Sequence, residues 1–478
     1  MDRQRLRRTW KKTFSLSWPV SAEHVLRTLM RTTDVLVAGS FSPAAVTAIG
    51  LADLYARFPL RVGLGLGGGA IALSSQDTGR EAEASRDEAI SQALLLGVLA
   101  GVPFVAFGLL FGEAALSLLG APPDIATMGG RYLAIVFATA PARHVALVGA
   151  RALQGTGDTK TPMYINVVSN ALNIAGSFIL GLGLFGAPRL SIIGVGVATA
   201  AANVFTALAL LVAFLTPWAA AGLVRPSNPV VARQLVRVSV PRIGEGLAAT
   251  LAEFPFNALL LGIGTEVNAA FQIGRRLYQQ VTAPLTRGYN VAASVLVGQA
   301  LGEEDPAEAT YRAWAIVALG VLSVGALGVG LFVGAPLLSG LFTNDAATLR
   351  YASGFARVYG ATAVATVTFT VLSGALQGAS ETRVPFVARV SGAFVFLLGL
   401  SALLVELGWG VHGVYVGVGL SWVWMALVAV VGFQHLNWAG RAAEMMAERA
   451  ANANGDGDDG ETDERDGGTD GREDERGA

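Results

Sequence analysis

The first apolar stretch of this chain, near residues 14–40, carries four charged residues on one helical face. They are spaced by four, four and three residues, which aligns them along one stripe of a helix: Glu23, Arg27, Arg31 and Asp34. At the middle of a bilayer each such charge costs about 2.5–3.5 kcal/mol unless it faces protein or water. The stripe therefore predicts a polar cavity in which Asp34 is a titratable or cation-binding carboxylate. Structural ion pairs within the stripe are the alternative, and for Glu23 they are the favoured interpretation.

A second charged stripe lies on the next apolar stretch. Asp53, Arg57 and Arg61 follow one another at intervals of four residues and share one helical face. We expect this stripe to face the first one, because charged faces in a membrane need polar neighbours. Arg57 and Arg61 would then hold Asp34 in its ionised form, or release it as the cavity changes shape. A buried charge network that only orders the two helices is the alternative.

The second half of the chain offers further cavity charges. Glu245 and Glu253 lie eight residues apart on the seventh apolar stretch, and so on roughly one face of a helix. We predict that both line the cavity and that Glu253 is the stronger candidate for a functional role. Pairing with arginines of the following stretch, such as Arg275 and Arg287, is the alternative.

Amide and hydroxyl side chains form a polar ridge on the fifth apolar stretch. Its members are spaced by four, three and four residues: Asn166, Asn170, Asn173 and Ser177. The sixth stretch adds Thr199. Oxygens of this kind can hydrogen-bond a protonated carboxyl group or complete an oxygen shell around a small cation. Hydrogen bonds between closely packed helices are the alternative.

The composition indicates a membrane protein. Of the 478 residues 53% are hydrophobic and only 14% are charged, whereas soluble domains carry about 25% charged residues. The chain has no Cys, which excludes disulfides, thiolate metal sites and cysteine nucleophiles. Its four histidines show no metal-binding spacing, and no hydrolase or ATP-binding motif occurs. We therefore predict a protein that is not an enzyme, has no cofactor and draws any uphill transport from an ion gradient.

Twelve apolar segments alternate with short polar or Gly/Pro-rich connections, and each is long enough to span a bilayer as a helix. The excess of Lys and Arg in alternate loops predicts that both termini are cytoplasmic. The end of the chain has little apolar content and is predicted to be disordered. The expected division is a basic N-terminus (1–12), a first six-helix bundle (13–216), a cytoplasmic linker (217–232), a second six-helix bundle (233–437) and an acidic disordered cytoplasmic tail (438–478).

An internal repeat relates the two halves. Residues 152–162 match residues 375–385 at an offset of 223, with six of eleven positions identical. The same offset relates three further pairs: Gln76 with Gln299, Gly79 with Gly302, and Asp34 with Asn257. An even number of spans returns the chain to its starting side, so the repeats run parallel. The predicted fold is an all-α membrane protein with twelve transmembrane helices in two parallel six-helix repeats, and the predicted substrate cavity lies at their seam.

These features resemble the multidrug and toxic compound extrusion (MATE) family, and most of all its DinF-type branch. The resemblance covers about residues 13–437. It rests on five segments: 33–39, 152–162 with its repeat, 166–173, 193–199 and 299–302. It implies a V-shaped pair of six-helix bundles in the cell membrane, which exports amphipathic and often cationic compounds in exchange for H+ or Na+.

The resemblance also implies roles for individual residues. Asp34 matches the cation-coupling carboxylate of the first span, and Asn173 and Thr199 match its partners, so Na+ would be bound by these three. Ser177 takes the position of a second acidic residue in those relatives, which leaves the ion and its stoichiometry open. Pro19 resembles a first-span proline associated with helix bending. The arginines of the first two spans make the cavity unusually basic, so anionic or zwitterionic substrates stay open.

Two other functions stay open at this point. A flippase for a lipid-linked precursor is the alternative transporter, since such proteins have basic cavities. A membrane-embedded enzyme or a scaffold is the alternative of another class, against which the repeat symmetry and the lack of a catalytic motif argue. The expected partners are the lipid bilayer and a small amphipathic substrate, without nucleic acid, and we expect a monomer.

Overall fold

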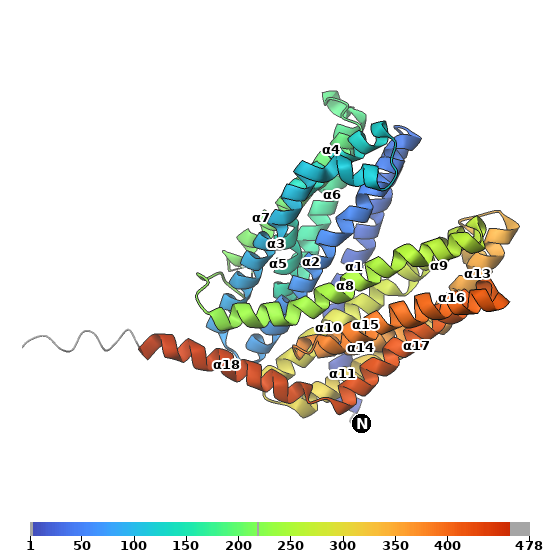
Figure 1. Cartoon of the computed structure of the whole chain (residues 1–478). Helices are drawn as coiled ribbons and strands as arrows, with labels where there is room; N and C mark the ends of the chain where they lie inside the picture. The colour runs from blue at the N-terminus through green and yellow to red at the C-terminus, as the bar shows by residue number, and fades with distance from the viewer. Residues whose placement is uncertain (1–2, 218, 459–478) are drawn as a thin grey trace, which may run out of the picture.

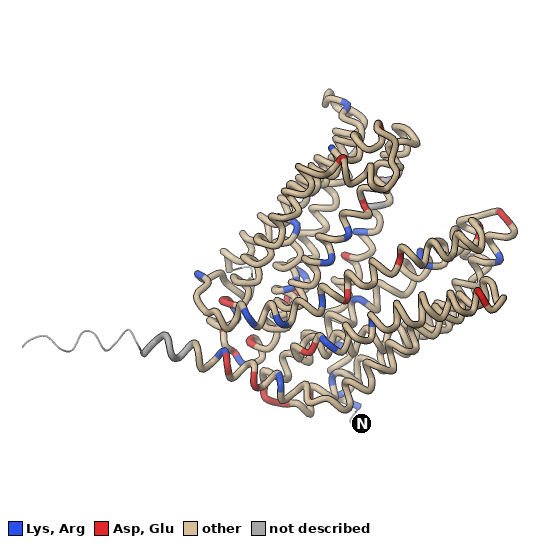
Figure 2. Tube along the Cα trace, viewed as in Figure 1, with Lys and Arg blue, Asp and Glu red and all other residues tan. Residues whose placement is uncertain are grey.

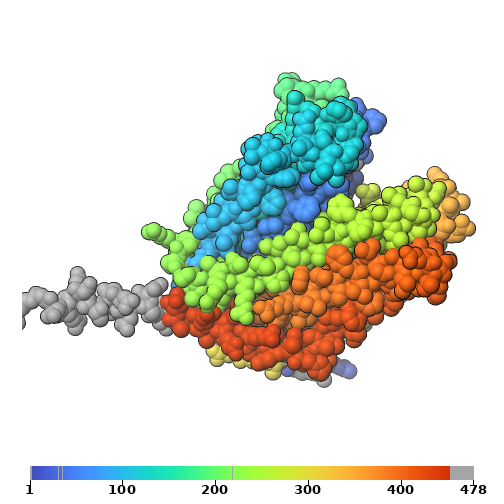
Figure 3. All heavy atoms as spheres, in the orientation of Figure 1, coloured from blue at the N-terminus to red at the C-terminus, as the bar shows by residue number. Residues whose placement is uncertain are grey.

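The computed structural model describes residues 3–217 and 219–458, without the side chains of Arg31, Val35 and residues 453–458. These residues form helices joined by short connections, with no strand among them. Figure 1 shows two bundles arranged as a V, one made by the N-terminal half and the other by the C-terminal half. The arms meet at the end that holds the N-terminus and separate at the other end, where the space-filling view shows a cleft between them (Figure 3).

The N-terminal arm begins with a helix that includes most of the basic segment predicted to stand apart from the first bundle. Its elements are α1 (Arg3–Gly39), α2 (Pro43–Gly79), α3 (Glu83–Leu118), α4 (Pro123–Ala138), α5 (Ala140–Gly155), α6 (Lys160–Leu182), the 3-10 turn η1 (Leu184–Gly186) and α7 (Ile192–Phe214).

The C-terminal arm repeats this order after a short linker. Its elements are α8 (Pro229–Ile263), α9 (Thr265–Val281), α10 (Ala283–Gly302), α11 (Pro306–Val333), α12 (Ala335–Gly340), α13 (Ala346–Ala361), α14 (Ala363–Gly378), α15 (Arg383–Ser391), the π-helix η2 (Gly392–Leu400), α16 (Ser401–Leu404), the π-helix η3 (Val405–Trp409) and α17 (Val411–His435). The chain then continues into α18 (Trp438–Asp458).

Each of the twelve predicted spans corresponds to a helix or to a group of consecutive helices, so the fold prediction is confirmed. Among the described residues, seven helical segments are long and apolar enough to cross a bilayer, and two bent pairs raise the number to nine. The other three spans are α1, α2, and α9 with α10. The two charged stripes lie on α1 and α2, and α9 with α10 carries Arg275, Arg276 and Arg287; these charges lower the hydropathy of the three spans.

Several predicted spans are bent or broken. α4 and α5 are bent by 49° around Thr139, and α13 and α14 by 51° around Thr362, which is the repeat-related position. Pro141 follows the first bend and lacks the N–H group that would continue the helical hydrogen bonds across it. The eighth predicted span is broken at Thr282, next to Pro284 at the start of α10. Hydropathy predicted single helices because a bent apolar pair and a straight apolar helix have the same composition.

Reciprocal contacts between repeat-related residues join the two arms. Gln76 Nε2 on α2 donates a hydrogen bond to the carbonyl oxygen of Gly378 at 2.8 Å. Gln299 Nε2 on α10 donates one to the carbonyl oxygen of Gly155 at 3.5 Å. Each glutamine thus reaches into the opposite arm and binds the repeated Gln-Gly segment there. The duplicated motif is therefore the joint between the arms.

Two glycines allow α2 and α10 to touch at this joint. An added Cβ atom would lie 2.1 Å from the carbonyl oxygen of Gln299 at Gly79, and 2.1 Å from that of Gln76 at Gly302. We expect Gly302→Ala to lower the free energy of unfolding by about 1–3 kcal/mol, the usual effect of overpacking. Melting temperatures of the purified protein in detergent measure this effect.

Gly330→Ala is the matched control for that prediction. Gly330 also lies within a helix, but no atom lies within 4 Å of its added Cβ. This substitution should be neutral or stabilising, because Ala favours the helix over Gly. Equal melting temperatures for the two variants would contradict the close contact at the joint.

The segment after the last span corrects the prediction of a wholly disordered tail. Residues Trp438–Asp458 form α18, which lies across the joined end of the arms (Figure 1). Trp438, Ala442 and Met446 are spaced by four residues and are buried, so they form an apolar stripe against the bundles. The prediction averaged the composition of the whole acidic segment and missed this stripe. Residues 459–478 of the predicted tail lie outside the described part of the chain.

Candidate functional site

Asp34 lies near the open end of α1, beside α6. Ser177 Oγ on α6 donates a hydrogen bond to Asp34 Oδ1 at 3.0 Å. The serine is fully buried, and the aspartate is half-buried. The half-buried Asp34 carboxylate is therefore bound directly by Ser177, a member of the predicted polar ridge.

Asn173 connects Asp34 to Thr199 on α7. The amide orientation that satisfies both of its ends lets the Asn173 nitrogen donate to Asp34 Oδ1 at 3.3 Å, while its oxygen accepts from Thr199 Oγ1 at 3.1 Å. The structure thus brings together all four residues predicted for cation coupling, on three helices of one arm. Hydrogen bonds to a carboxylate favour its charged form, so neutralising Asp34 would weaken these contacts.

Removing the Ser177 hydroxyl should change the pH dependence of any proton-driven transport. Ser177→Ala deletes one donor to the charged carboxylate of Asp34 and so makes protonation easier. We expect the pH midpoint of efflux to rise by about one pH unit, which corresponds to about 1.4 kcal/mol. Efflux rates measured across pH in liposomes test this. Ser169→Ala is the control on the same helix, because Ser169 donates to the Ala202 carbonyl instead, and an equal shift in that variant would contradict the assignment.

The arginines of the α2 stripe do not hold Asp34, so that prediction is wrong. Arg57 Nη1 contacts Glu253 Oε2 at 2.7 Å, and Arg61 Nε donates to Thr250 Oγ1 at 3.0 Å. Both acceptors lie on α8, so the arginines of α2 bind the other arm rather than holding Asp34. The prediction failed because helical spacing defines a face but does not identify the neighbouring helix.

Glu253 bridges three helices. In addition to Arg57 of α2, it contacts Arg275 Nη1 of α9 at 3.0 Å. One turn further along α8, Asn257 accepts a hydrogen bond from Gln272 Nε2 at 2.9 Å. The repeat partner of Asp34 is therefore bound to an amide rather than to a charged group. These contacts agree with the pairing alternative for Glu253.

The remaining predicted residues of the first two spans have varied surroundings. Arg27 Nη2 contacts Glu23 Oε1 at 2.7 Å within α1, as the ion-pair interpretation of Glu23 predicts. Asp53 is exposed on α2, and the side chain of Arg31 lies outside the description. Pro19 is buried within α1, which continues as one helix through it.

Glu245 is the most buried of the predicted cavity carboxylates in the second half. It contacts Arg242 on its own helix and Arg389 Nε on α15 at 3.5 Å. Sequence reasoning missed both partners, and it also missed Arg151 on α5. The rule that singled out Arg27, a charge inside an apolar span, would have found all three. Figure 2 shows that many charged residues follow the helices along the seam, while the outer flanks of both arms are largely uncharged.

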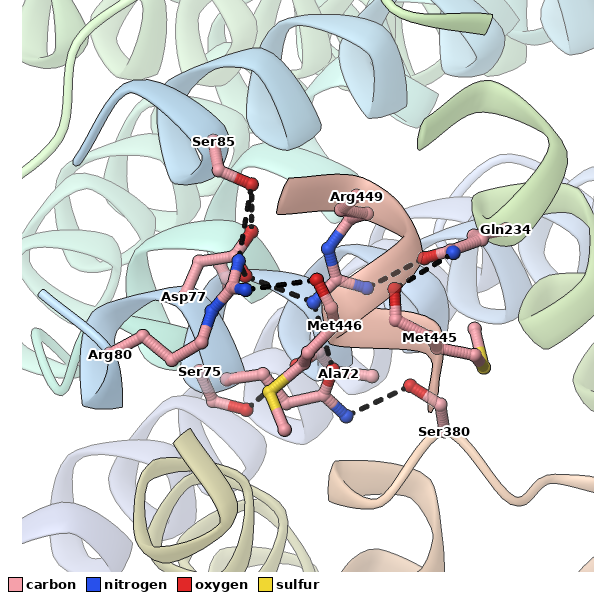
Figure 4. A network of polar contacts seen from close by, with 12 residues as sticks. Ala72, Ser75, Asp77, Arg80, Ser85, Gln234, Ser380, Met445, Met446 and Arg449 are labelled. Atoms are coloured by element: carbon pink, nitrogen blue, oxygen red, sulfur yellow. Dashed lines mark hydrogen bonds and ion pairs between the residues drawn. The ribbon is translucent and has the colours of Figure 1, made fainter. Parts of the chain in front are cut away.

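A second buried charge network closes the joined end of the arms (Figure 4). Arg449 Nη2 of α18 contacts Asp77 Oδ1 of α2 at 2.9 Å, and both side chains are fully buried. Arg449 Nη1 also donates to Gln234 Oε1 of α8 at 2.6 Å, while Asp77 Oδ1 contacts Arg80 Nη2 at 2.7 Å. Arg449 therefore binds both arms at once. Burial lowers the pKa of its guanidinium, and the negative charge of Asp77 opposes that shift.

Known proteins are similar in sequence to this chain along most of its length. A family model described as MatE matches residues 19–179 and 241–403, one segment in each arm. A "Probable multidrug resistance protein NorM" of Bradyrhizobium diazoefficiens is 31% identical over 442 residues, which cover 89% of this chain and 93% of that protein. The "Multidrug resistance protein NorM" of Burkholderia vietnamiensis is 26% identical over 456 residues, which cover 91% of each chain.

Solved structures share the fold. A crystal structure of MATE in the bent conformation has a TM-score of 0.82 and 21% identity, and the match covers 94% of this chain and 98% of that one. A crystal structure of MATE in the straight conformation has a TM-score of 0.81 and 22% identity, and the match covers 93% of this chain and 98% of that one. The two relatives described above bear the NorM name, so the DinF-type branch stays a prediction. With one matched segment in each arm and a relative similar along most of its length, this chain belongs to the MATE family.

Proposed function

We propose that this chain is a cation-coupled antiporter that exports amphipathic small molecules from the cell by alternating access. The observation that carries the proposal is the Asp34 carboxylate, bound by Ser177 and Asn173 inside one arm of a two-repeat V. The multidrug resistance names of the relatives support an exporter of drug-like compounds. Family membership also favours a transporter over an enzyme.

Asp34 would couple ion binding to the shape of its arm. In its charged form it accepts hydrogen bonds from α6, and a proton would neutralise it and weaken those bonds. Na+ would instead be bound by Asp34 with the oxygens of Asn173 and Thr199, a set of oxygen donors that suits a hard cation. Either ion drives transport only if it binds one access state more tightly than the other.

The cleft faces the outside in this proposal. The joined end of the arms holds the N-terminus and α18, and the basic loops predict that this end is cytoplasmic. Export would then proceed as the two arms rock about the seam. Pro19 lacks an N–H group and cannot complete the helical hydrogen bond to Ser15, which gives α1 a place to bend.

Dye efflux from proteoliposomes tests the proposal. The purified protein is reconstituted with a fluorescent dye, and an inward gradient of protons or of sodium is imposed separately. We expect efflux under at least one gradient and none in protein-free liposomes. Dye efflux at the same rate with and without each gradient would overturn the antiport mechanism. The gradient that drives efflux identifies the coupling ion.

A further inference from the structure

Arginines from both arms converge on the seam between α2 and α8. The positive charges of Arg287 and Arg389 act on Arg61, and those of Arg242 and Arg287 act on Arg151. Arg287 of α10 therefore lies within electrostatic range of guanidinium groups on both α2 and α5. We name this set the seam arginines; it comprises Arg61, Arg151, Arg242, Arg287 and Arg389.

The side chains of three of these arginines pack directly against glycines of neighbouring helices. A Cβ atom on Gly67 would lie 2.8 Å from Arg151 Cγ, and one on Gly68 would lie 3.0 Å from Arg242 Cγ. On α8, a Cβ atom on Gly246 would lie 2.9 Å from Arg61 Cδ. The glycines thus make room for side chains that arrive from neighbouring helices. The positions of these charges are built into the packing of the seam.

The two α8 carboxylates beside the seam arginines each contact more than one arginine. Glu245 already contacts both Arg242 and Arg389, and Glu253 is shared by two other arginines. Within the described residues, Arg61 and Arg151 form no ion pair; their hydrogen bonds go to Thr250 and to Gln154 Oε1 at 3.1 Å. Glu253 and Glu23 attract them only from a longer range.

This imbalance has an electrostatic consequence. Like charges repel one another, and the repulsion weakens as their separation grows. An anion placed among the seam arginines would attract several of them at once. Guanidinium groups also match the fork geometry of carboxylate, sulfonate and phosphate groups. A cation at this place would instead add to the repulsion.

Aromatic rings lie beside the charged groups in the C-terminal arm. The Arg389 guanidinium carbon stands 4.7 Å from the centre of the Phe369 ring and 5.2 Å from that of Trp422. Tyr278 packs against Trp422 at 5.9 Å and stacks on Tyr359 at 5.2 Å between ring centres. Tyr278 and Trp422 are half-buried and keep some accessible surface. Such rings can pack against an apolar or aromatic body attached to an anionic group.

We propose that the seam arginines and the adjoining aromatic rings form an anion-binding site, and that the preferred substrates are amphipathic anions bearing a carboxylate, sulfonate or phosphate group. The inference rests on the proposed export function, because it names the substrate class of that cleft. The acidic group binds near Arg61 and Arg151, and the apolar body packs toward Trp422.

Equilibrium binding of two related dyes tests the substrate class without any gradient. Fluorescein is anionic and rhodamine 123 is cationic, and both have a xanthene core. In fluorescence polarisation with detergent-purified protein, we expect fluorescein to bind at least about tenfold more tightly, equal to about 1.4 kcal/mol. Its affinity should fall as salt rises. Tighter binding of rhodamine 123 would overturn the proposal.

Charge-removing variants locate the site. Arg61→Gln and Arg151→Gln should each weaken fluorescein binding about tenfold, whereas Arg61→Lys keeps the charge and should retain most of the affinity. Arg350→Gln is the control, since Arg350 is exposed and lies in α13, away from the seam. Melting temperatures confirm that each variant is folded. Unchanged fluorescein affinity in folded Arg61→Gln and Arg151→Gln would overturn the assignment.

Competition distinguishes two sources of the anion. Displacement of fluorescein by short-chain phosphatidylglycerol, but not by the uncharged-headgroup analogue diacylglycerol, would support the site and identify a lipid headgroup as its ligand. Displacement only by a soluble naphthalene sulfonate would support the site and identify a soluble anion.

Because binding needs no ion gradient, failure of this inference is separable from failure of antiport. A protein that pumps rhodamine 123 but not fluorescein is an antiporter without the proposed anion site.

Discussion

Asp34→Asn is expected to abolish ion-coupled efflux while leaving the protein folded and inserted in the membrane. Asn has nearly the same shape as Asp and can still accept a hydrogen bond from Ser177, whose hydroxyl lies 3.0 Å from Asp34 Oδ1. It cannot ionise, so it cannot change charge when an ion arrives. The free energy that links ion binding to the access state would then vanish. A coupling of 1–3 kcal/mol corresponds to about 5- to 150-fold, so we expect a loss of about a hundredfold.

The measurement is dye efflux from liposomes under a proton gradient and, separately, a sodium gradient. Asp124→Asn is the control, because Asp124 is exposed at the start of α4. Its efflux should equal that of the unmodified chain. Normal gradient-driven efflux by Asp34→Asn would rule out Asp34 as the coupling group. A variant that fails to reconstitute would be replaced by Asp34→Ser, which also lacks a charge.

Asp77→Asn is expected to destabilise the joined end of the arms and to release α18. Asp77 and Arg449 are fully buried partners at 2.9 Å. Removing the carboxylate leaves the guanidinium of Arg449 in a buried position without its counter-charge, which costs about 3–5 kcal/mol in comparable buried pairs. Arg80, which contacts the same carboxylate, would lose its ion-pair partner too. We expect a clear fall in melting temperature and faster hydrogen exchange along α18.

Glu448→Gln is the matched control, because Glu448 directly precedes Arg449 on α18. Glu448 is 42% exposed and pairs with Arg233, which is 65% exposed, and exposed pairs contribute about 0–1 kcal/mol. The double variant Asp77→Asn with Arg449→Met removes both buried charges and should recover part of the stability lost in Asp77→Asn alone. Equal melting temperatures for Asp77→Asn and Glu448→Gln would show that the buried pair does not hold α18.

The sequence predicted the candidate coupling site better than the surrounding charge network. Asn173 and Ser177 lie four residues apart, so they had to share a face of α6, and the repeat had already shown that Asp34 has no acidic counterpart. The partners of Arg57 and Arg61 could not be predicted in the same way. A stripe of charges indicates that a helix faces something polar, but several helices of a bundle offer polar faces.

Local pattern and duplication determined the spans, the two-arm architecture and the grouping of polar residues on single helices. Helical periodicity and the repeat offset are properties of the chain itself, and no distant contact is needed to read them. The repeat showed that Gln76 and Gln299 are equivalent, but only the tertiary structure showed that each binds the opposite arm. It also decided that Arg449 reaches Asp77 and that arginines of α2, α5, α8, α10 and α15 meet at one seam. Such contacts join residues far apart in the chain, and they depend on how closely glycine-lined helices approach, which sequence spacing does not specify.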